Sequence, residues 1–105
     1  MTGERRWRRN PVPAVVRKGD WGLGHSGYPP TRVMDGSVDV LIMGVAVARA
    51  GDALAAHRKH KHPLHARIIA NGVPSVLVNG RPIAVSGGAV SCGGALLANG
   101  HVEAG

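Results

Sequence analysis

Two segments of this chain resemble each other closely enough to constrain the fold. Residues 35–52 read "DGSVDVLIMGVAVARAGD" and residues 71–88 read "NGVPSVLVNGRPIAVSGG". Their glycines and valines align at one constant offset, without a gap. Shorter matches occur at residues 17–20, "RKGD", which resemble "RAGD" at residues 49–52, and at residues 99–105, "NGHVEAG". An internal repeat of this size indicates one structural unit used several times, with pseudo-symmetry as the expected result.

Each repeat has the pattern of a β-hairpin. A glycine turn leads into an apolar run, a glycine-containing pair follows, and a second apolar run comes next. Asn79-Gly80 is a strong two-residue hairpin signal because both residue types tolerate positive φ. A single hairpin is marginally stable in water, so the hairpins must pack on one another. We therefore predict an all-β fold of short hairpins, interrupted at residues 53–64, where residues 53–57 could form a short helical turn.

The composition predicts a thin core that needs additional support. The chain has 105 residues, with no Phe, one Tyr and two Trp. Such a small core is usually supplemented by a disulfide, a metal ion or a partner subunit. Because Cys92 is the only cysteine, an internal disulfide is excluded. A metal or a partner remains.

The positive charge is concentrated at the N-terminus. The formal net charge is +7, and residues 1–18 contain six basic residues against one acidic residue. We divide the chain into a basic N-terminal arm, residues 1–15, and a domain, residues 16–105. A solvated tail and a segment that contacts an acidic surface or nucleic acid are both compatible with such an arm. The arm is not followed by an apolar block, so we expect synthesis in the cytoplasm without a signal peptide.

Four of the six histidines lie in "HRKHKHPLH", residues 57–65. They could be metal ligands, a pH-sensitive basic patch or a solvated loop. His25 and His57 each follow a "GD" by five residues, and Cys92 follows the equivalent "GG" by four. Pseudo-symmetry would bring these three positions together at one end of the fold, with His65 as a fourth candidate. His60 and His62 resemble surface residues of the loop.

Three imidazoles and one thiolate form a closed tetrahedral set that suits zinc, and iron is also compatible with these ligands. Because no coordination position is left open, the set favours a structural metal over a hydrolytic one. A metal would also support the thin core.

Several of these motifs together resemble the PAAR-repeat family of spike-tip proteins. The relevant segments are "RKGDWGLGHSGYPP" at residues 17–30, the two repeats, and the closing "SCGG" at residues 91–94. "AVAR" at residues 46–49 stands where the family has Pro-Ala-Ala-Arg, and "RPIAV" at residues 81–85 occupies the second such place. The chain departs from the family pattern at four places, which are Val38, Ala46, Val85 and Gly87-Gly88.

The resemblance implies a small cone of short β-hairpins with pseudo-threefold symmetry and a metal near the vertex. Carried over by position, the metal ligands are His25, His57, His65 and Cys92. The family's role is structural and not enzymatic: one cone caps one trimeric β-helical spike in a type VI secretion system or a contractile phage tail. The implied location is the tip of a secretion tube or virion tail, with transient contact with a target envelope and a possible cargo effector.

The sequence supports two other classes of function less well. A metal-dependent hydrolase needs an open metal position and a general base, and the sequence has no HExxH motif. A nucleic-acid-binding module would use base-stacking aromatics, and the domain offers only Trp21 and Tyr28. We therefore expect no enzyme activity and no stable nucleic-acid complex. The residues do not distinguish a phage tail, a bacteriocin and a secretion system.

Overall fold

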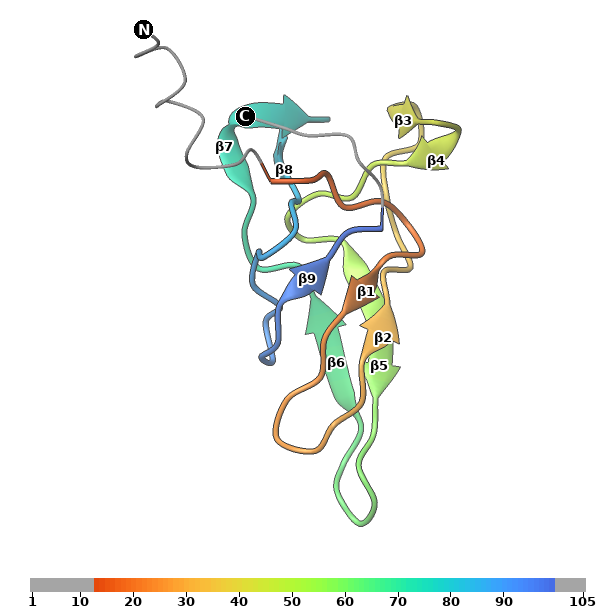
Figure 1. The fold of residues 1–105 in the computed structure, drawn as a ribbon, viewed down its shortest axis with the longest axis vertical. Helices are drawn as coiled ribbons and strands as arrows, with labels where there is room; N and C mark the ends of the chain where they lie inside the picture. The colour runs from red at the N-terminus through yellow and green to blue at the C-terminus, as the bar shows by residue number, and fades with distance from the viewer. Residues whose placement is uncertain (1–12, 100–105) are drawn as a thin grey trace, which may run out of the picture.

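The computed structural model describes residues 13–99, and these residues form short β-strands and no helix (Figure 1). All strand pairs are antiparallel. The predicted all-β class is therefore confirmed. The strands are β1 (Trp21–Gly22), β2 (Thr31–Arg32), β3 (Leu41–Ile42), β4 (Val45–Ala46), β5 (Ala53–His57), β6 (His65–Ile68), β7 (Val73–Val78), β8 (Arg81–Ile83) and β9 (Leu96–Leu97).

Both repeats form the predicted hairpins, β3–β4 and β7–β8. Their turns are Met43-Gly44, with φ of 53° and 79°, and Asn79-Gly80, with φ of 54° and 79°. Two successive positive φ values define the type I′ turn that matches the twist of an antiparallel pair. The two hairpins lie at the same end of the molecule, at the top of Figure 1, which we call the wide end.

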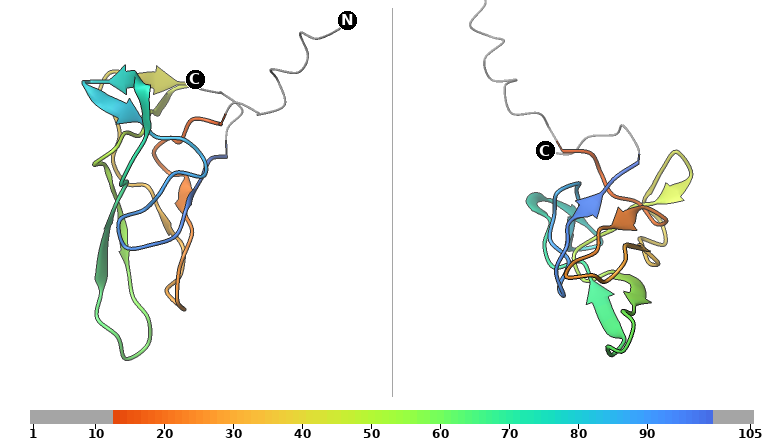
Figure 2. Two further views of the ribbon diagram at one scale, coloured as in Figure 1. Left: turned by 90° about the vertical axis from the view of Figure 1, so that its left-hand side faces the viewer. Right: turned by 60° about the horizontal axis from the view of Figure 1, so that its bottom comes forward.

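The helical turn suggested for residues 53–57 is wrong, because these residues form strand β5. The strand pairs with β6, so its backbone groups find partners that a five-residue helix could not supply. Pairing also buries Leu54, which joins the core cluster. Strands β5 and β6 extend to the opposite, narrow end of the molecule, where residues 58–64 connect them (Figures 1 and 2).

Three related turns establish the pseudo-threefold order. They occupy residues 17–20, 49–52 and 85–88, and in each the fourth N–H donates to the first carbonyl over 3.0 Å. The third residue of each turn is a glycine, and the three φ values are 94°, 92° and 89°. This position of a type II turn requires positive φ, which explains why glycine recurs there.

The three turns are joined by a closed ring of hydrogen bonds at the centre of the fold. Val16 N–H donates to the Ala84 carbonyl over 2.9 Å, Ala84 N–H donates to Ala48 over 3.0 Å, and Ala48 N–H donates to Val16 over 3.0 Å. All three residues have no exposed surface. We call these residues the axial ring. Each residue donates a hydrogen bond to one of the other two and accepts one from the other. The ring therefore gives a single continuous chain threefold order at its centre.

Below the axial ring, three branches run toward the narrow end (Figures 1 and 2). They are residues 21–32, which include β1 and β2, residues 53–68, which include β5 and β6, and residues 89–95. The third branch is closed by an Ala89–Ala95 bridge. Within residues 13–99, no helix is long and apolar enough to cross a membrane. Most of the predicted N-terminal arm, and residues 100–105 of the third partial repeat, lie outside the described residues.

Candidate metal centre

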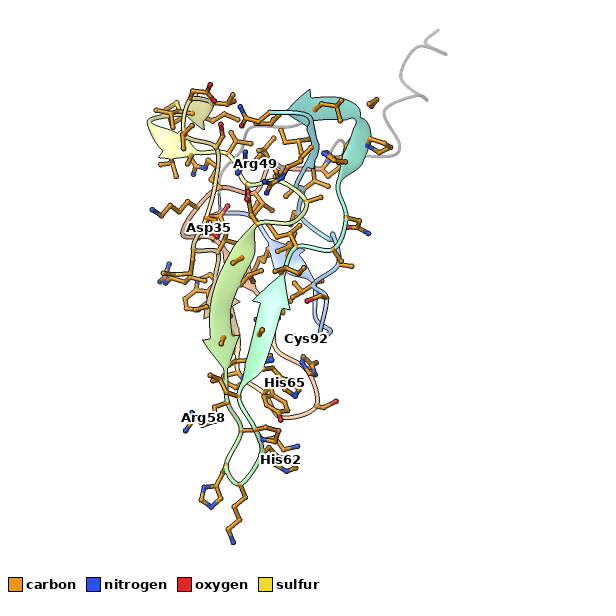
Figure 3. All side chains as sticks on the ribbon, turned by 180° about the vertical axis from the view of Figure 1, so that it is seen from behind. Asp35, Arg49, Arg58, His62, His65 and Cys92 are labelled. Carbon is orange, nitrogen blue, oxygen red and sulfur yellow. The ribbon has the colours of Figure 1, made fainter. Side chains whose placement is uncertain are left out.

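The three branches bring the four predicted ligands together at the narrow end. One ligand atom each from His25, His57, His65 and Cys92 lies within 4.8 Å of the others, so the group can hold a metal ion. The first branch supplies His25, the third supplies Cys92, and His57 and His65 face each other as partners on β5 and β6. Figure 3 labels His65 and Cys92 in this region.

Two tight turns place the ligands of the first and third branches. His25 forms a bridge to Tyr28 across Ser26 and Gly27, whose φ values of 46° and 85° are those of a narrow hairpin turn. Gly93, which follows Cys92, has φ of 116°, a conformation that side chains with a Cβ rarely adopt. A Cβ there would also lie 3.0 Å from Cγ of His25. Glycine therefore lets the third branch approach the first closely.

The orientation of His57 leaves one nitrogen available for a metal. Its Nδ1 lies 2.9 Å from the Pro29 carbonyl, which fixes the proton on Nδ1 and turns Nε2 inward. Nε2 lies 3.5 Å from Sγ of Cys92. Zinc bonds of about 2.0 Å to nitrogen and about 2.3 Å to sulfur give a tetrahedral N–S edge of about 3.5 Å. The spacing of these two ligand atoms therefore fits a tetrahedral zinc site.

Two buried imidazole nitrogens support the same interpretation. Nε2 of His25 and Nδ1 of His65 have no hydrogen-bond partner among the described residues. Buried polar atoms are nearly always paired, and a metal would supply a partner. Burial lowers the pKa of His25, and the neighbouring His57 and His65 lower it further. A lowered pKa favours the neutral imidazole, which is the form that binds metals.

Tyr28 packs among the three histidines, and the sequence analysis missed this role. Its ring centroid lies 4.1 Å from that of His65, with the planes 18° apart, and 4.8 Å from that of His57. Its hydroxyl donates to the Pro63 carbonyl over 3.3 Å. Tyr28 therefore fixes the imidazoles from one side. It is the only tyrosine, three residues after His25 in a tight turn, and this proximity was the available signal.

Arg67 is the second residue that sequence reasoning missed. Its side chain is buried, with 1% exposed. The guanidinium donates to the carbonyls of Gly22 at 2.9 Å, Leu23 at 2.5 Å and Gly93 at 3.2 Å, and to the Thr31 hydroxyl at 2.9 Å. It thus ties the second branch to the first and third. Because side chains alternate along a strand, Arg67 shares a face of β6 with His65 once residues 65–68 are known to form a strand.

The remaining histidines have different positions. His60 and His62 are exposed in the loop between β5 and β6 and do not belong to the group that can hold a metal. Figure 3 shows His62 closer to the tip of this loop than His65, which lies on β6. His101 lies outside the described residues.

The fold is an all-β cone with pseudo-threefold order, and its narrow end carries a group of three histidines and one cysteine. These features define a class of small structural domain with a possible metal site. The family model of the PAAR motif matches residues 23–98. The chain therefore belongs to the PAAR-motif family. No curated protein matches its sequence.

Proposed function

We propose that this protein is a structural tip that caps a trimeric β-helical spike, one tip for each trimer, in a contractile injection machine. The axial ring is the observation that supports this function. A single chain with internal threefold order can sit on the axis of a trimer and offer related contacts to all three subunits. A chain without such order would fit one subunit and leave two uncovered.

The chemistry of the wide end suits docking. Apolar side chains are exposed on and around the β3–β4 and β7–β8 hairpins: Val38 is 93% exposed, Met43 85%, Leu77 58% and Leu41 55%. Apolar surface of this kind is typical of protein interfaces. The end of a β-helical spike has unpaired strand groups that need cover. Burial of roughly 800 Å² on each partner is typical of a stable interface.

We assign a structural metal to the narrow end, with zinc as the expected ion and iron as the alternative. His25, His57, His65 and Cys92 would fill a tetrahedral shell and leave no position for a reactive water. The role is therefore mechanical and not enzymatic. The metal would lock the three branches where the core is thinnest.

The proposed location follows from this role. The protein is made in the cytoplasm and assembled at the tip of a secretion tube or virion tail, from which it reaches a target envelope. A separate cargo effector is compatible with it. The type VI secretion system and the contractile phage tail are the two machines that the family resemblance suggests.

A matched pair of substitutions tests the docking surface. Leu41 on β3 and Leu64 in the β5–β6 loop are 55% and 54% exposed, at opposite ends of the molecule. Co-expression with a trimeric spike protein should give a complex of one tip and three spike chains by native mass spectrometry. Leu41→Glu should release the tip, and Leu64→Glu should leave the complex intact. If both variants bind equally well, the wide end is not the docking surface.

A further inference from the structure

The acidic residues of the described part are confined to one part of the molecule, away from the narrow end. All four acidic residues of the described part lie within residues 20–52, and the sequence from residue 53 to residue 99 contains neither Asp nor Glu. The first branch, residues 21–32, also lacks them. Figure 3 shows Asp35 in the upper half, with Arg58 near the opposite end. The narrow end is therefore cationic without compensating carboxylates.

Within the narrow end, the positive charge is greatest in residues 58–64, which we call the vertex loop. It carries Arg58, Lys59 and Lys61, and every residue in it except Lys59 is exposed. Figure 3 shows its side chains spreading outward from the end of the β5–β6 hairpin. Leu64 adds an apolar side chain that is 54% exposed. The vertex loop thus combines three permanent charges with apolar surface.

The vertex loop is anchored to the first branch. Nζ of Lys59 donates to the Ser26 carbonyl over 2.8 Å and lies 5.6 Å from the centroid of the Tyr28 ring. A turn is closed by His62 N–H, which donates to the Lys59 carbonyl over 2.9 Å, and Lys61 at its corner has φ of 63°. These contacts present Arg58 and Lys61 on a narrow, preformed tip.

We propose that the vertex loop binds a phosphate-bearing anionic lipid surface. Basic side chains close to such a surface strengthen binding by about fivefold for each charge. An exposed leucine beside them can enter the boundary between headgroups and acyl chains. Single-stranded nucleic acid is instead bound in grooves with stacking aromatics, and Tyr28, the aromatic side chain nearest this loop, is only 8% exposed.

This inference does not rest on spike docking, because it concerns the opposite end of the molecule. A tip that fails to cap a spike can still bind lipid, and the reverse also holds. The two experiments therefore fail separately.

The test compares two exposed lysines, one in the vertex loop and one away from it. Lys61 lies in the vertex loop and Lys18 in the first turn of residues 17–20, beside the axial ring. Each Lys→Glu substitution removes two units of positive charge from the full-length chain. Binding is measured by co-sedimentation with vesicles of phosphatidylcholine, with or without phosphatidylglycerol. Lys61→Glu should weaken binding to the anionic vesicles about 30-fold, and Lys18→Glu should change it little.

The N-terminal arm needs its own control, because its arginines would also attract anionic lipid. Both substitutions are repeated in a full-length chain whose Arg5, Arg6, Arg8 and Arg9 are replaced by Ser, and the difference between them should persist. Leu64→Ser, a second vertex variant, should also weaken vesicle binding. Melting temperatures establish that each variant is folded.

Three results would overturn the proposal. Equal binding by Lys61→Glu and Lys18→Glu would show that net charge decides, and loss of all binding in the arm variant would assign it to residues 1–15. Tighter binding to duplex DNA than to vesicles, weakened by Lys61→Glu, would make nucleic acid the partner of the vertex loop.

Discussion

Replacing Arg67 by methionine should destabilise the narrow end more than any change to an exposed residue nearby. Methionine keeps much of the apolar stem but removes every donor of the guanidinium. The carbonyls of Gly22, Leu23 and Gly93 would then lose a charged donor. A buried acceptor left unpaired costs about 1–3 kcal/mol, and a partly buried one costs less. The buried bond to Gly22 at about 2 kcal/mol and the two part-buried bonds at about 0.5 kcal/mol each give about 3 kcal/mol.

An opposing effect must be weighed in the same substitution. Burying a cation costs several kcal/mol, and Arg67→Met relieves that cost. The bond to the Gly22 carbonyl is buried, however, those to Leu23 and Gly93 are partly buried, and methionine cannot donate to any of the three carbonyls. Removing one partner of a buried polar network is typically strongly destabilising, whereas replacing the whole network need not be. We therefore expect a net loss of about 3 kcal/mol, a large fraction of the stability of a small domain.

Urea denaturation of the metal-saturated protein measures this loss, and thermal melting should show a decrease of roughly 12 °C or more. Arg67→Lys is the control for charge, because it keeps the cation but cannot reach several carbonyls at once. Its stability should lie between those of the parent and Arg67→Met. If Arg67→Met lies within about 0.5 kcal/mol of the parent, within the range of ordinary surface substitutions, then the guanidinium does not hold the three branches together.

Three further predictions concern the metal, the acid limit and one glycine. Protein purified without a chelator should contain about one zinc per chain by elemental analysis. His57→Ala and Cys92→Ala should lose the metal and melt at a lower temperature, whereas His60→Ala should do neither. A parent protein that is fully folded without metal would contradict the assignment. Burial alone would raise the pKa of Asp52, but hydrogen bonds and charge from Arg49 and the charge of Arg81 lower this pKa below 3.8. The ionised Asp52 therefore stabilises the fold above pH 3.8, and this stabilisation is lost as the pH falls through the lowered pKa. Asp52→Asn should accordingly flatten the decline of stability in acid, measured by urea denaturation at a series of pH values. Gly93→Ala should weaken zinc binding in a competition assay and cost about 1–3 kcal/mol, because the φ of Gly93 is 116° and the added Cβ would lie 3.0 Å from Cγ of His25. Gly44→Ala, with φ of 79° and nothing within 4 Å of its Cβ, should cost about 1–2 kcal/mol and leave zinc affinity unchanged.

The repeat was sufficient to predict the hairpins because their geometry is local. Asn79-Gly80 and Met43-Gly44 adopt the positive φ values that the turn chemistry requires. The grouping of His25, His57 and Cys92 could also be expected, since similar spacings after equivalent turns bring these residues to one level, and the family resemblance added support for His65. Glycines and apolar spacing therefore carried most of the information about the fold.

What could not be predicted depends on contacts between segments that are distant in sequence. Residues 53–57 are rich in alanine, and their local preference gave the wrong helical turn; pairing with β6 decides their conformation. Arg67 has ordinary sequence neighbours, and its burial depends on carbonyls 26 and 45 residues away. The axial ring joins backbone groups of the three residues that directly precede the turns, and a sequence reveals such a ring only after the pseudo-symmetry has been assumed.

The second branch explains how a threefold fold provides a fourfold metal shell. Strict symmetry would supply one ligand from each branch, which is too few for a closed tetrahedral site. The second branch is longer than the other two, and its two strands bring His57 and His65 face to face. The same extension carries the vertex loop beyond the proposed metal. Breaking the symmetry in one branch thus completes the ligand set and extends the narrow end, and shortening the loop between His57 and His65 should keep the metal while removing the cationic tip.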